Sequence, residues 1–154
     1  MYPYDDKKHL FIISDEHYKF AQKFIKEGKS VLDVGCGTGA LIPYLQNVDY
    51  LGIDATLWAV EKANDPRITF CDVFGYNGNF DYVCAFGVLD TALDLKVLAD
   101  KLKSLGNVLL FSFREGTQKK KFNQYTTEEV IEAFGKIELI EGKTSDETYG
   151  IWRK

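Results

Sequence analysis

A short strand-like run, residues 30–34, leads directly into three glycines within five positions, Gly35, Gly37 and Gly39. Glycine has no Cβ, so a backbone rich in it can approach a ligand closely. If a helix follows such a loop, its first turn also offers unpaired backbone N–H groups to an anion. Three glycines directly after a strand therefore indicate a ligand-binding loop in an α/β protein, and not merely a tight turn.

The rest of the chain alternates predicted strands with predicted helices. Further strands are expected over residues 50–53, 67–71, 80–86 and 107–113, with a terminal hairpin over 136–141 and 148–152. Helices are expected over about 15–27 with Ser14 as cap, 39–46 with Pro43 near its first turn, 56–63 with Thr56 as cap, 95–105, and 126–134 with a Thr126–Glu129 capping box. This alternation predicts a mostly parallel sheet that is covered on both faces and binds ligands beyond the carboxyl ends of its strands.

The composition is that of one globular domain. The 154 residues are 45% apolar and 27% charged, and the net charge of −4 argues against a surface built to coat nucleic acid or anionic lipid. The apolar stretches are far shorter than the roughly 20 residues of a membrane helix, and the N-terminal residues lack the apolar core of a secretory signal. Three cysteines without Cys-x-x-Cys spacing and two histidines argue against a disulfide framework and against a metal site, so we expect a reducing, cytoplasmic location.

A carboxylate lies at the end of each of the first three predicted strands. Asp33 lies two residues before the first glycine, Asp54 ends the second strand, and Asp72 follows the third. Asp33 suits a ligand with an ammonium group, Asp54 can accept both hydroxyls of a ribose, and Asp72 can accept from an adenine amino group. Each also has a simpler interpretation: a loop hydrogen bond for Asp33, a strand-end turn residue for Asp54 and a loop residue for Asp72.

The glycine spacing by itself leaves the ligand ambiguous. Gly35, Gly37 and Ala40 also fit G-x-G-x-x-A, the fingerprint of dinucleotide-binding folds. Asp33 favours a ligand with an ammonium group over a dinucleotide, because its carboxylate would face an incoming pyrophosphate unfavourably.

Taken together, these segments resemble a known family, the class I S-adenosylmethionine-dependent methyltransferases. The resemblance is carried by Asp33-Val34-Gly35-Cys36-Gly37-Thr38-Gly39, Gly52-Ile53-Asp54, Cys71-Asp72-Val73 and the run from Phe80 to Asp90. It implies a three-layer αβα Rossmann-like fold, with a seven-stranded, mostly parallel sheet of order 3-2-1-4-5-7-6 and an antiparallel last strand. It also implies S-adenosyl-L-methionine as the cofactor and S-adenosyl-L-homocysteine as its product.

The resemblance further implies roles on the methionine side of the cofactor. Gly35, Gly37 and Gly39 would cradle the methionine part, and Asp33 would help to hold its amino group. The Phe86 backbone carbonyl, after the fourth strand, would meet the same ammonium.

On the nucleoside side, the resemblance implies that Asp54 binds the ribose hydroxyls. Asp72 and the Val73 N–H would bind the adenine. Cys36 and Ala55, which lie within or next to these segments, complete the expected cofactor-binding set.

One stretch departs from the family. Residues 72–79 must cross about 22 Å of the implied sheet and can span at most about 27 Å. Little room is left for the helix that the family often has there, so we expect an irregular link.

Fewer residues mark the acceptor side. Methyl transfer requires donor and acceptor to be held in line, and a base is needed only if the acceptor keeps its proton at neutral pH. Asp90, after the fourth strand, and His17, on the first helix, are candidates for that base. The nearby Asp94 is more simply interpreted as a helix N-cap. His17 is more simply interpreted as a helix residue that faces the solvent.

Some substrate classes are disfavoured. The chain has Phe86-Gly87-Val88-Leu89 where enzymes acting on planar amino nitrogens have Asn/Asp-Pro-Pro-Tyr, and it has no Pro-Cys pair to attack cytosine. Three lysines, Lys119, Lys120 and Lys121, could contact phosphates and bases, although a solvated loop is the simpler interpretation.

We therefore expect a single domain in which residues 1–29 form an N-terminal segment whose helix covers the cofactor site, and residues 30–154 form the methyltransferase domain. The acceptor is expected to be a small molecule, with nucleic acid and protein as open alternatives and no indication of the oligomeric state. One alternative is a donor-binding or inactive subunit that needs a partner chain. Another is an NAD(P)-dependent oxidoreductase, which would lack a recognisable catalytic Tyr-x-x-x-Lys.

Overall fold

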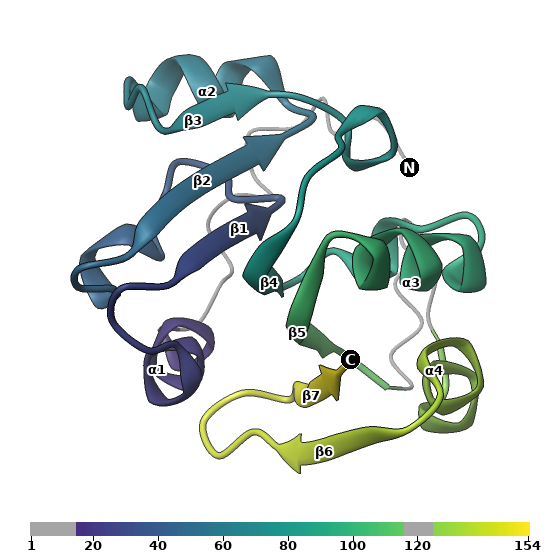
Figure 1. Ribbon diagram of the computed structural model, residues 1–154. Coiled ribbons are helices and arrows are strands. Elements are labelled where there is room, and N and C mark those ends of the chain that lie inside the picture. The colour runs from purple at the N-terminus through teal and green to yellow at the C-terminus, as the bar shows by residue number, and fades with distance from the viewer. Residues whose placement is uncertain (1–14, 116–124) are drawn as a thin grey trace.

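The computed structural model describes residues 15–115 and 125–154, and a seven-stranded sheet forms its centre (Figure 1). The strands are β1 (Ser30–Val34), β2 (Asp49–Asp54), β3 (Ile68–Phe70), β4 (Phe80–Ala85), β5 (Gly106–Phe113), β6 (Ile137–Glu141) and β7 (Thr148–Arg153). Their order is β3-β2-β1-β4-β5-β7-β6, as the family resemblance predicts. The strands β1 to β5 are parallel, and β7 runs antiparallel to both β5 and β6. The predicted terminal hairpin is therefore confirmed.

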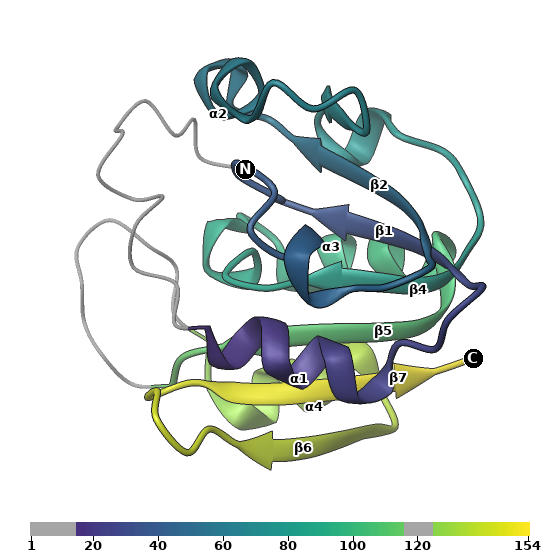
Figure 2. The same ribbon diagram turned by 90° about the vertical axis from the view of Figure 1, so that its left-hand side faces the viewer.

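Helices cover both faces of the sheet, which gives three layers (Figure 2). The helices α1 (Glu16–Phe24) and α2 (Leu57–Ala63) lie on one face, and α3 (Leu95–Ser104) and α4 (Thr127–Phe134) lie on the other. Neighbouring strand residues alternate between the two layers. Leu32 packs in the cluster under α3 and α4, and Val31 packs in the cluster under α1. This alternation is the pattern of a strand that is buried on both faces.

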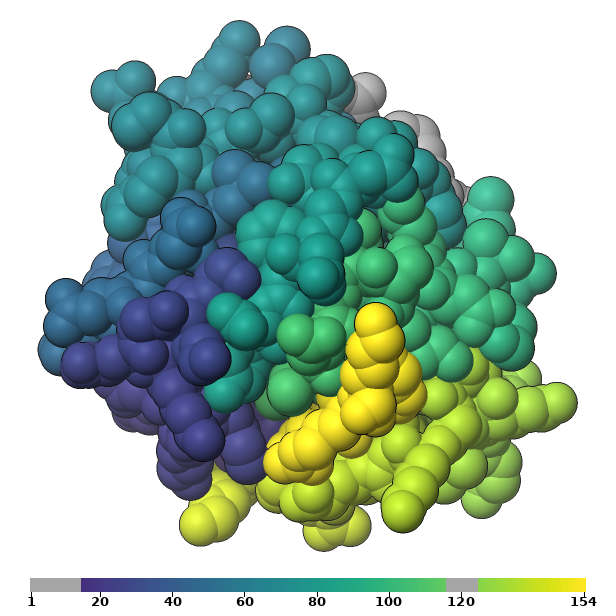
Figure 3. Space-filling view, viewed as in Figure 1, coloured from purple at the N-terminus to yellow at the C-terminus, as the bar shows by residue number. Residues whose placement is uncertain are grey.

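The helix α1 packs on the sheet through its middle turn. Phe20 and Ala21 are buried, and the Phe20 ring stacks on Tyr149 of β7 with ring centroids 4.6 Å apart. In the space-filling view α1 (purple) lies beside the C-terminal strand (yellow), as Figure 3 shows. The helix ends at Phe24 and not at the predicted residue 27, because Ile25 is already extended. The predicted cap, Ser14, lies outside the described residues.

One predicted helix is wrong. Over residues 39–46 the chain forms only a single 3-10 turn, η2 (Ile42–Tyr44). Gly39 has a φ of +84°, which lies outside the helical range, and Pro43 lacks the N–H that a longer helix would use. The glycine loop is therefore not followed by an α-helix N-terminus, and the anion site expected there has no structural basis.

Other local predictions are confirmed. Residues 72–79 contain only the 3-10 turn η3 (Val73–Gly75), in agreement with the expected irregular link. Thr126 and Glu129 form the capping box of α4, and Asp94 caps α3 by accepting a hydrogen bond from the Val97 N–H. A third 3-10 turn, η4 (Leu89–Thr91), follows β4.

Candidate functional site

The glycine loop after β1 adopts a left-handed backbone conformation. Gly35, Gly37 and Gly39 have φ values of +68°, +55° and +84°, which residues with side chains rarely adopt. A Cβ at Gly35 would also lie 2.8 Å from Val88 Cγ2, and one at Gly39 would lie 2.8 Å from Ile68 Cδ1. Packing within the protein therefore already requires glycine at two of these positions, and close approach by a ligand stays a prediction.

Asp54, at the end of β2, ties this loop to the strand. Its Oδ2 accepts a hydrogen bond from the Gly37 N–H and its Oδ1 accepts one from the Thr56 N–H, both at 2.8 Å. Thr56 is the N-cap residue of α2, as predicted, but its side chain makes no capping bond. Because each carboxylate oxygen can accept two hydrogen bonds, Asp54 can hold the loop and still accept a ligand hydroxyl on each oxygen.

Asp33 is buried inside β1, beside the loop. The Tyr50 hydroxyl of β2 donates a hydrogen bond to its Oδ2 at 2.8 Å. Burial raises the pKa of Asp33 to about 7; the Tyr50 hydrogen bond opposes this shift and the negative charge of Asp54 adds to it. Gly52 lies opposite Asp33, and a Cβ there would come within 2.9 Å of the Tyr50 hydroxyl. Glycine at this position thus makes room for the Tyr50 side chain to reach Asp33.

The other predicted donor-binding residues follow the same edge of the sheet. Phe70 of β3 lies opposite Asp54 in a parallel pairing, so Asp72 comes just beyond that edge. Asp72 is exposed, and its Oδ1 accepts a hydrogen bond from the Phe74 N–H at 2.9 Å, which caps η3. Of the remaining set, Cys36, Val73 and Phe86 are buried, and Ala55 is exposed.

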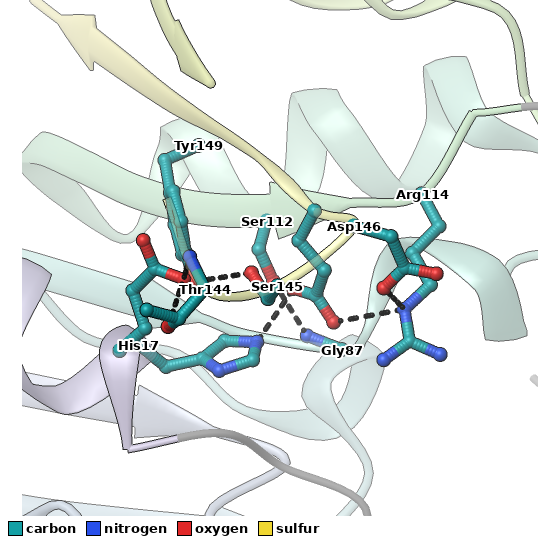
Figure 4. A network of polar contacts seen from close by, with 10 residues as sticks. His17, Gly87, Ser112, Arg114, Thr144, Ser145, Asp146 and Tyr149 are labelled. Carbon is teal, nitrogen blue, oxygen red and sulfur yellow. Dashed lines mark hydrogen bonds and ion pairs between the residues drawn. The ribbon is translucent and has the colours of Figure 1, made fainter. Parts of the chain in front are cut away.

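A second group of polar side chains lies at the ends of β4 and β5, before the start of β7 and on the first turn of α1; Figure 4 labels His17, Ser112, Arg114 and Asp146 of this group. We call it the polar cluster; its members are His17, Asp90, Ser112, Arg114, Asp146 and Glu147. Glu147 Oε2 lies 2.5 Å from His17 Nε2, and Glu147 Oε1 lies 3.3 Å from Arg114 Nε. Burial alone would raise the pKa of Glu147, but hydrogen bonds from His17 and Ser112 and the charge of Arg114 outweigh it and lower that pKa.

His17 is buried, so its interpretation as a solvent-facing residue is wrong. Its exposed fraction is 1%, and its ring lies edge-on to the rings of Phe86 and Tyr149, with centroids 5.5 Å and 5.6 Å away. The first turn of α1 therefore places an imidazole against the residue that follows β4. The Nε2 atom of this imidazole is hydrogen-bonded to Glu147.

Asp90 lies in η4, within the electrostatic influence of Glu147 and Arg114. Its Oδ1 is buried and has no hydrogen-bond partner among the described residues. Burial and the negative charge of Glu147 raise the pKa of Asp90 to about 6, against the opposing charge of Arg114. Buried polar atoms in folded proteins nearly always have partners, so this oxygen is a candidate contact for a ligand.

The loop before β7 is also fixed to α1. Glu16 Oε1 accepts a hydrogen bond from the Lys143 N–H at 2.5 Å, and its Oε2 accepts from the Thr144 N–H at 3.1 Å. Desolvation raises the pKa of Glu16, but these hydrogen bonds outweigh it and lower the pKa to about 2. The first turn of α1 is thus bound to the loop that carries Glu147.

Sequence reasoning missed Tyr50, Arg114 and Glu147. Arg114 directly follows β5, which is the kind of strand-end position that marked Asp54, so the same rule could have found it. Glu147 comes before β7, and only the antiparallel direction of β7 brings it to the edge where the parallel strands end.

A family model described as "Methyltransferase domain" matches residues 8–134. The match spans well over half of the 154 residues. The chain belongs to the methyltransferase-domain family. A search among curated proteins finds no match.

Several solved structures are similar to this methyltransferase-domain protein. A magnesium protoporphyrin IX methyltransferase from Synechocystis PCC 6803 with bound S-adenosylhomocysteine matches with a TM-score of 0.72 and 19% identity, over 89% of this chain and 80% of that one. A TehB-like SAM-dependent methyltransferase from Corynebacterium glutamicum matches with a TM-score of 0.69 and 20% identity, over 90% and 87%. A Haloferax volcanii complex of the Trm112 methyltransferase activator and a methyltransferase matches with a TM-score of 0.71 and 14% identity. The match covers 89% of this chain and 88% of that one. At these identities the likeness establishes the class I methyltransferase fold.

Two further observations concern the described part of this methyltransferase. None of its helices is both long and apolar enough to span a membrane. Residues 15–115 and 125–154 contain no group of three or more His, Cys, Asp or Glu side chains that could hold a metal ion. The predicted basic segment Lys119, Lys120 and Lys121 lies outside the described residues.

Proposed function

We propose that this protein is an S-adenosylmethionine-dependent methyltransferase that acts on a small-molecule acceptor. The observation that carries the proposal is the pair of buried carboxylates, Asp33 and Asp54, beside the glycine loop at the adjoining ends of β1 and β2. Membership of the methyltransferase-domain family supports it.

The charges at this edge of the sheet fit a cationic donor. The side chains of Asp33, Asp54 and Asp72 suit an ammonium group, two ribose hydroxyls and an adenine amino group, in that order. A pyrophosphate would instead face these carboxylates without the α-helix N-terminus that dinucleotide-binding folds supply, because η2 is a single turn. The contrast favours a methyltransferase over an NAD(P)-dependent oxidoreductase.

The residues of the proposed donor site then divide between the two halves of the donor. Asp33 and the Phe86 carbonyl bind the amino group, and the loop from Gly35 to Gly39, with Cys36, cradles the methionine part. The nucleoside half is bound by Asp54 with Ala55 at the ribose, and by Asp72 with the Val73 N–H at the adenine.

Bound S-adenosylmethionine would supply a methyl group on a positively charged sulfur. The chain's contribution is to hold the acceptor in line with that methyl group and, where the acceptor carries a proton, to remove it. Asp90 and His17 are the candidate bases. Both belong to the polar cluster, and α1, within the N-terminal segment 1–29, would cover this side of the donor.

Calorimetric titration of the full chain tests the proposal. S-adenosylhomocysteine should bind with one-to-one stoichiometry, and NAD should produce no heat of binding at the same concentration. Binding of NAD without binding of S-adenosylhomocysteine would transfer the assignment to an oxidoreductase.

The likeness to a methyltransferase in complex with an activator favours one alternative, a subunit that needs a partner chain. S-adenosylhomocysteine formation by the isolated chain, given S-adenosylmethionine and a small-molecule extract, separates the two. Turnover by the isolated chain supports the first proposal. Donor binding without turnover, restored only by a second protein, supports the alternative.

A further inference from the structure

We propose that Asp90 binds the methyl acceptor through an O–H or N–H group of that molecule, and that Glu147 and Arg114 are positioning residues for Asp90. The inference rests on the proposed methyltransferase function and gives the acceptor a chemical class: an alcohol, phenol or amine, and not a carboxylate. It also separates the two candidate bases, because Asp90 Oδ1 has no hydrogen-bond partner among the described residues, whereas His17 Nε2 is hydrogen-bonded to Glu147.

Asp90 lies between the proposed donor loop and the other members of the polar cluster. Two residues before it, the Val88 side chain occupies the space beside Gly35, where a Cβ would come within 2.8 Å of Val88 Cγ2. On the other side, the Gly87 N–H donates a hydrogen bond to Ser112 Oγ of β5 at 3.1 Å. The turn that carries Asp90 is therefore fixed both to the donor loop and to β5, so a molecule bound at Asp90 would lie beside the donor.

The Oδ1 atom of Asp90 has the chemistry of an acceptor site for a hydrogen bond. It is buried and has no hydrogen-bond partner among the described residues. A buried carboxylate oxygen has lost its hydration, and only a donor group can offset that cost. An O–H or N–H of a ligand supplies such a donor, whereas a ligand carboxylate would add a further negative charge beside Asp90 and Glu147.

Among the described residues, two charged side chains act on Asp90 through their electric field: Glu147 before β7 and Arg114 after β5. Each is held by a further residue, since His17 of α1 bonds to Glu147 and Asp146 pairs with Arg114 Nε at 3.1 Å. Figure 4 shows His17 on α1 and the Arg114–Asp146 pair, which come from separate elements. A negative and a positive side chain, each held in place, therefore act on Asp90. Removing the negative charge of Glu147 should lower the pKa of Asp90, and removing the positive charge of Arg114 should raise it.

The chemical step balances without another reactant. The acceptor's oxygen or nitrogen attacks the methyl carbon, and a new O–C or N–C bond forms as the S–C bond breaks, with its electron pair left on sulfur. The acceptor's proton passes to the Asp90 carboxylate. Asp90 returns this proton to solvent after the methylated product leaves.

The first test follows the Asp90 carboxyl carbon by NMR as a function of pH in the full chain. Glu147→Gln should move the titration of Asp90 to lower pH, and Arg114→Gln should move it to higher pH. The matched controls are Glu138→Gln and Arg153→Gln, which alter an exposed ion pair of 3.1 Å on the same hairpin and should leave the titration unchanged. Shifts of the same sign in both cluster variants, or no shift, would overturn the positioning role.

The second test measures transfer of the tritium-labelled methyl group from S-adenosylmethionine to phenol, benzylamine and benzoate. Wild type should methylate phenol or benzylamine, and Asp90→Asn should reduce this rate by about 100-fold or more with unchanged affinity for S-adenosylhomocysteine. Transfer to benzoate, transfer to none of the three probes, or a full rate in Asp90→Asn would overturn the assignment. A wild-type protein that does not bind S-adenosylhomocysteine would instead contradict the proposed function itself.

Discussion

The two halves of the site are built differently. The donor half, at the ends of β1 and β2, is held by short-range hydrogen bonds: Gly37 to Asp54 and Tyr50 to Asp33 each join residues 17 positions apart. The polar cluster is held by charged groups from distant parts of the chain, and its central contact, His17 to Glu147, joins residues 130 positions apart. The first half is a local motif of the neighbouring strands β1 and β2 and the loop between them, and the second exists only when α1 and β7 have both packed onto the sheet.

This difference predicts which changes each half tolerates. A local hydrogen-bonded loop should lose its ligand when its backbone is altered while the fold persists. A buried network drawn from α1, β5 and the loop before β7 should instead couple directly to global stability, because its members hold those elements together.

The largest expected effect is on the donor half. Gly37 has a φ of +55° and donates its N–H to Asp54, and a β-branched residue is strongly disfavoured there. We expect Gly37→Val to abolish S-adenosylhomocysteine binding in calorimetry while circular dichroism still reports a folded, helical protein. Gly28→Val is the matched control, since Gly28 has a φ of +73° and open space around it. If that variant loses binding equally, backbone strain alone explains the result.

Next comes an effect on the polar cluster. Glu147→Ala removes the carboxylate shared by the buried His17 and the half-buried Arg114, and breaking a buried pair such as His17–Glu147 costs about 3 kcal/mol or more in the free energy of unfolding. Chemical denaturation measures this loss. Glu138→Ala, in an exposed pair, should cost less than about 1 kcal/mol. Equal losses in the two variants would show that the cluster does not hold the fold together.

A smaller effect distinguishes the two tasks of Asp54. We expect Asp54→Ala to weaken S-adenosylhomocysteine binding by about 1.5–3 kcal/mol, the scale of hydrogen bonds to a charged group. Calorimetry gives this value, and a melting curve checks that the protein remains folded. Asp65→Ala, which removes a turn carboxylate bonded to Arg67, is the control and should leave binding unchanged. Unchanged affinity in Asp54→Ala would reject the ribose assignment and leave Asp54 as a loop anchor only.

The smallest effect is a pH dependence of the donor half. Asp33 has a pKa raised to about 7, so its ionised form, which pairs with an ammonium group, becomes populated as the pH rises. The affinity for S-adenosylhomocysteine should therefore increase by about tenfold between pH 6 and 8. The stability of the free protein should change in the opposite direction, because the raised pKa favours folding below the unfolded-state pKa and that contribution is lost as the pH rises to about 7. Asp33→Asn should flatten both curves, and a wild-type affinity that does not change with pH would contradict the ammonium assignment.

Much of the fold could be predicted because its signals are local. The strand that ends just before Gly35, the capping box of Thr126 and Glu129, and the terminal hairpin all depend on residues close together in the sequence, and the structure confirms them. The helix over residues 39–46 was a wrong prediction for an equally local reason: Gly39 and Pro43 prevent the turns around them from continuing. The strand-end rule selected Asp33 and Asp54 because parallel strands finish at one edge of the sheet.

The sequence by itself therefore determined the order of the elements, the glycine loop and the carboxylates beside it, since each depends on local backbone preferences along the chain. Only the tertiary structure decided that Tyr50 reaches Asp33, that His17 is buried, and that Glu147 meets Arg114. These contacts depend on which strands become neighbours and on the antiparallel direction of β7. No local pattern encodes them, because a side chain acquires its partner and its desolvation only when distant segments pack together.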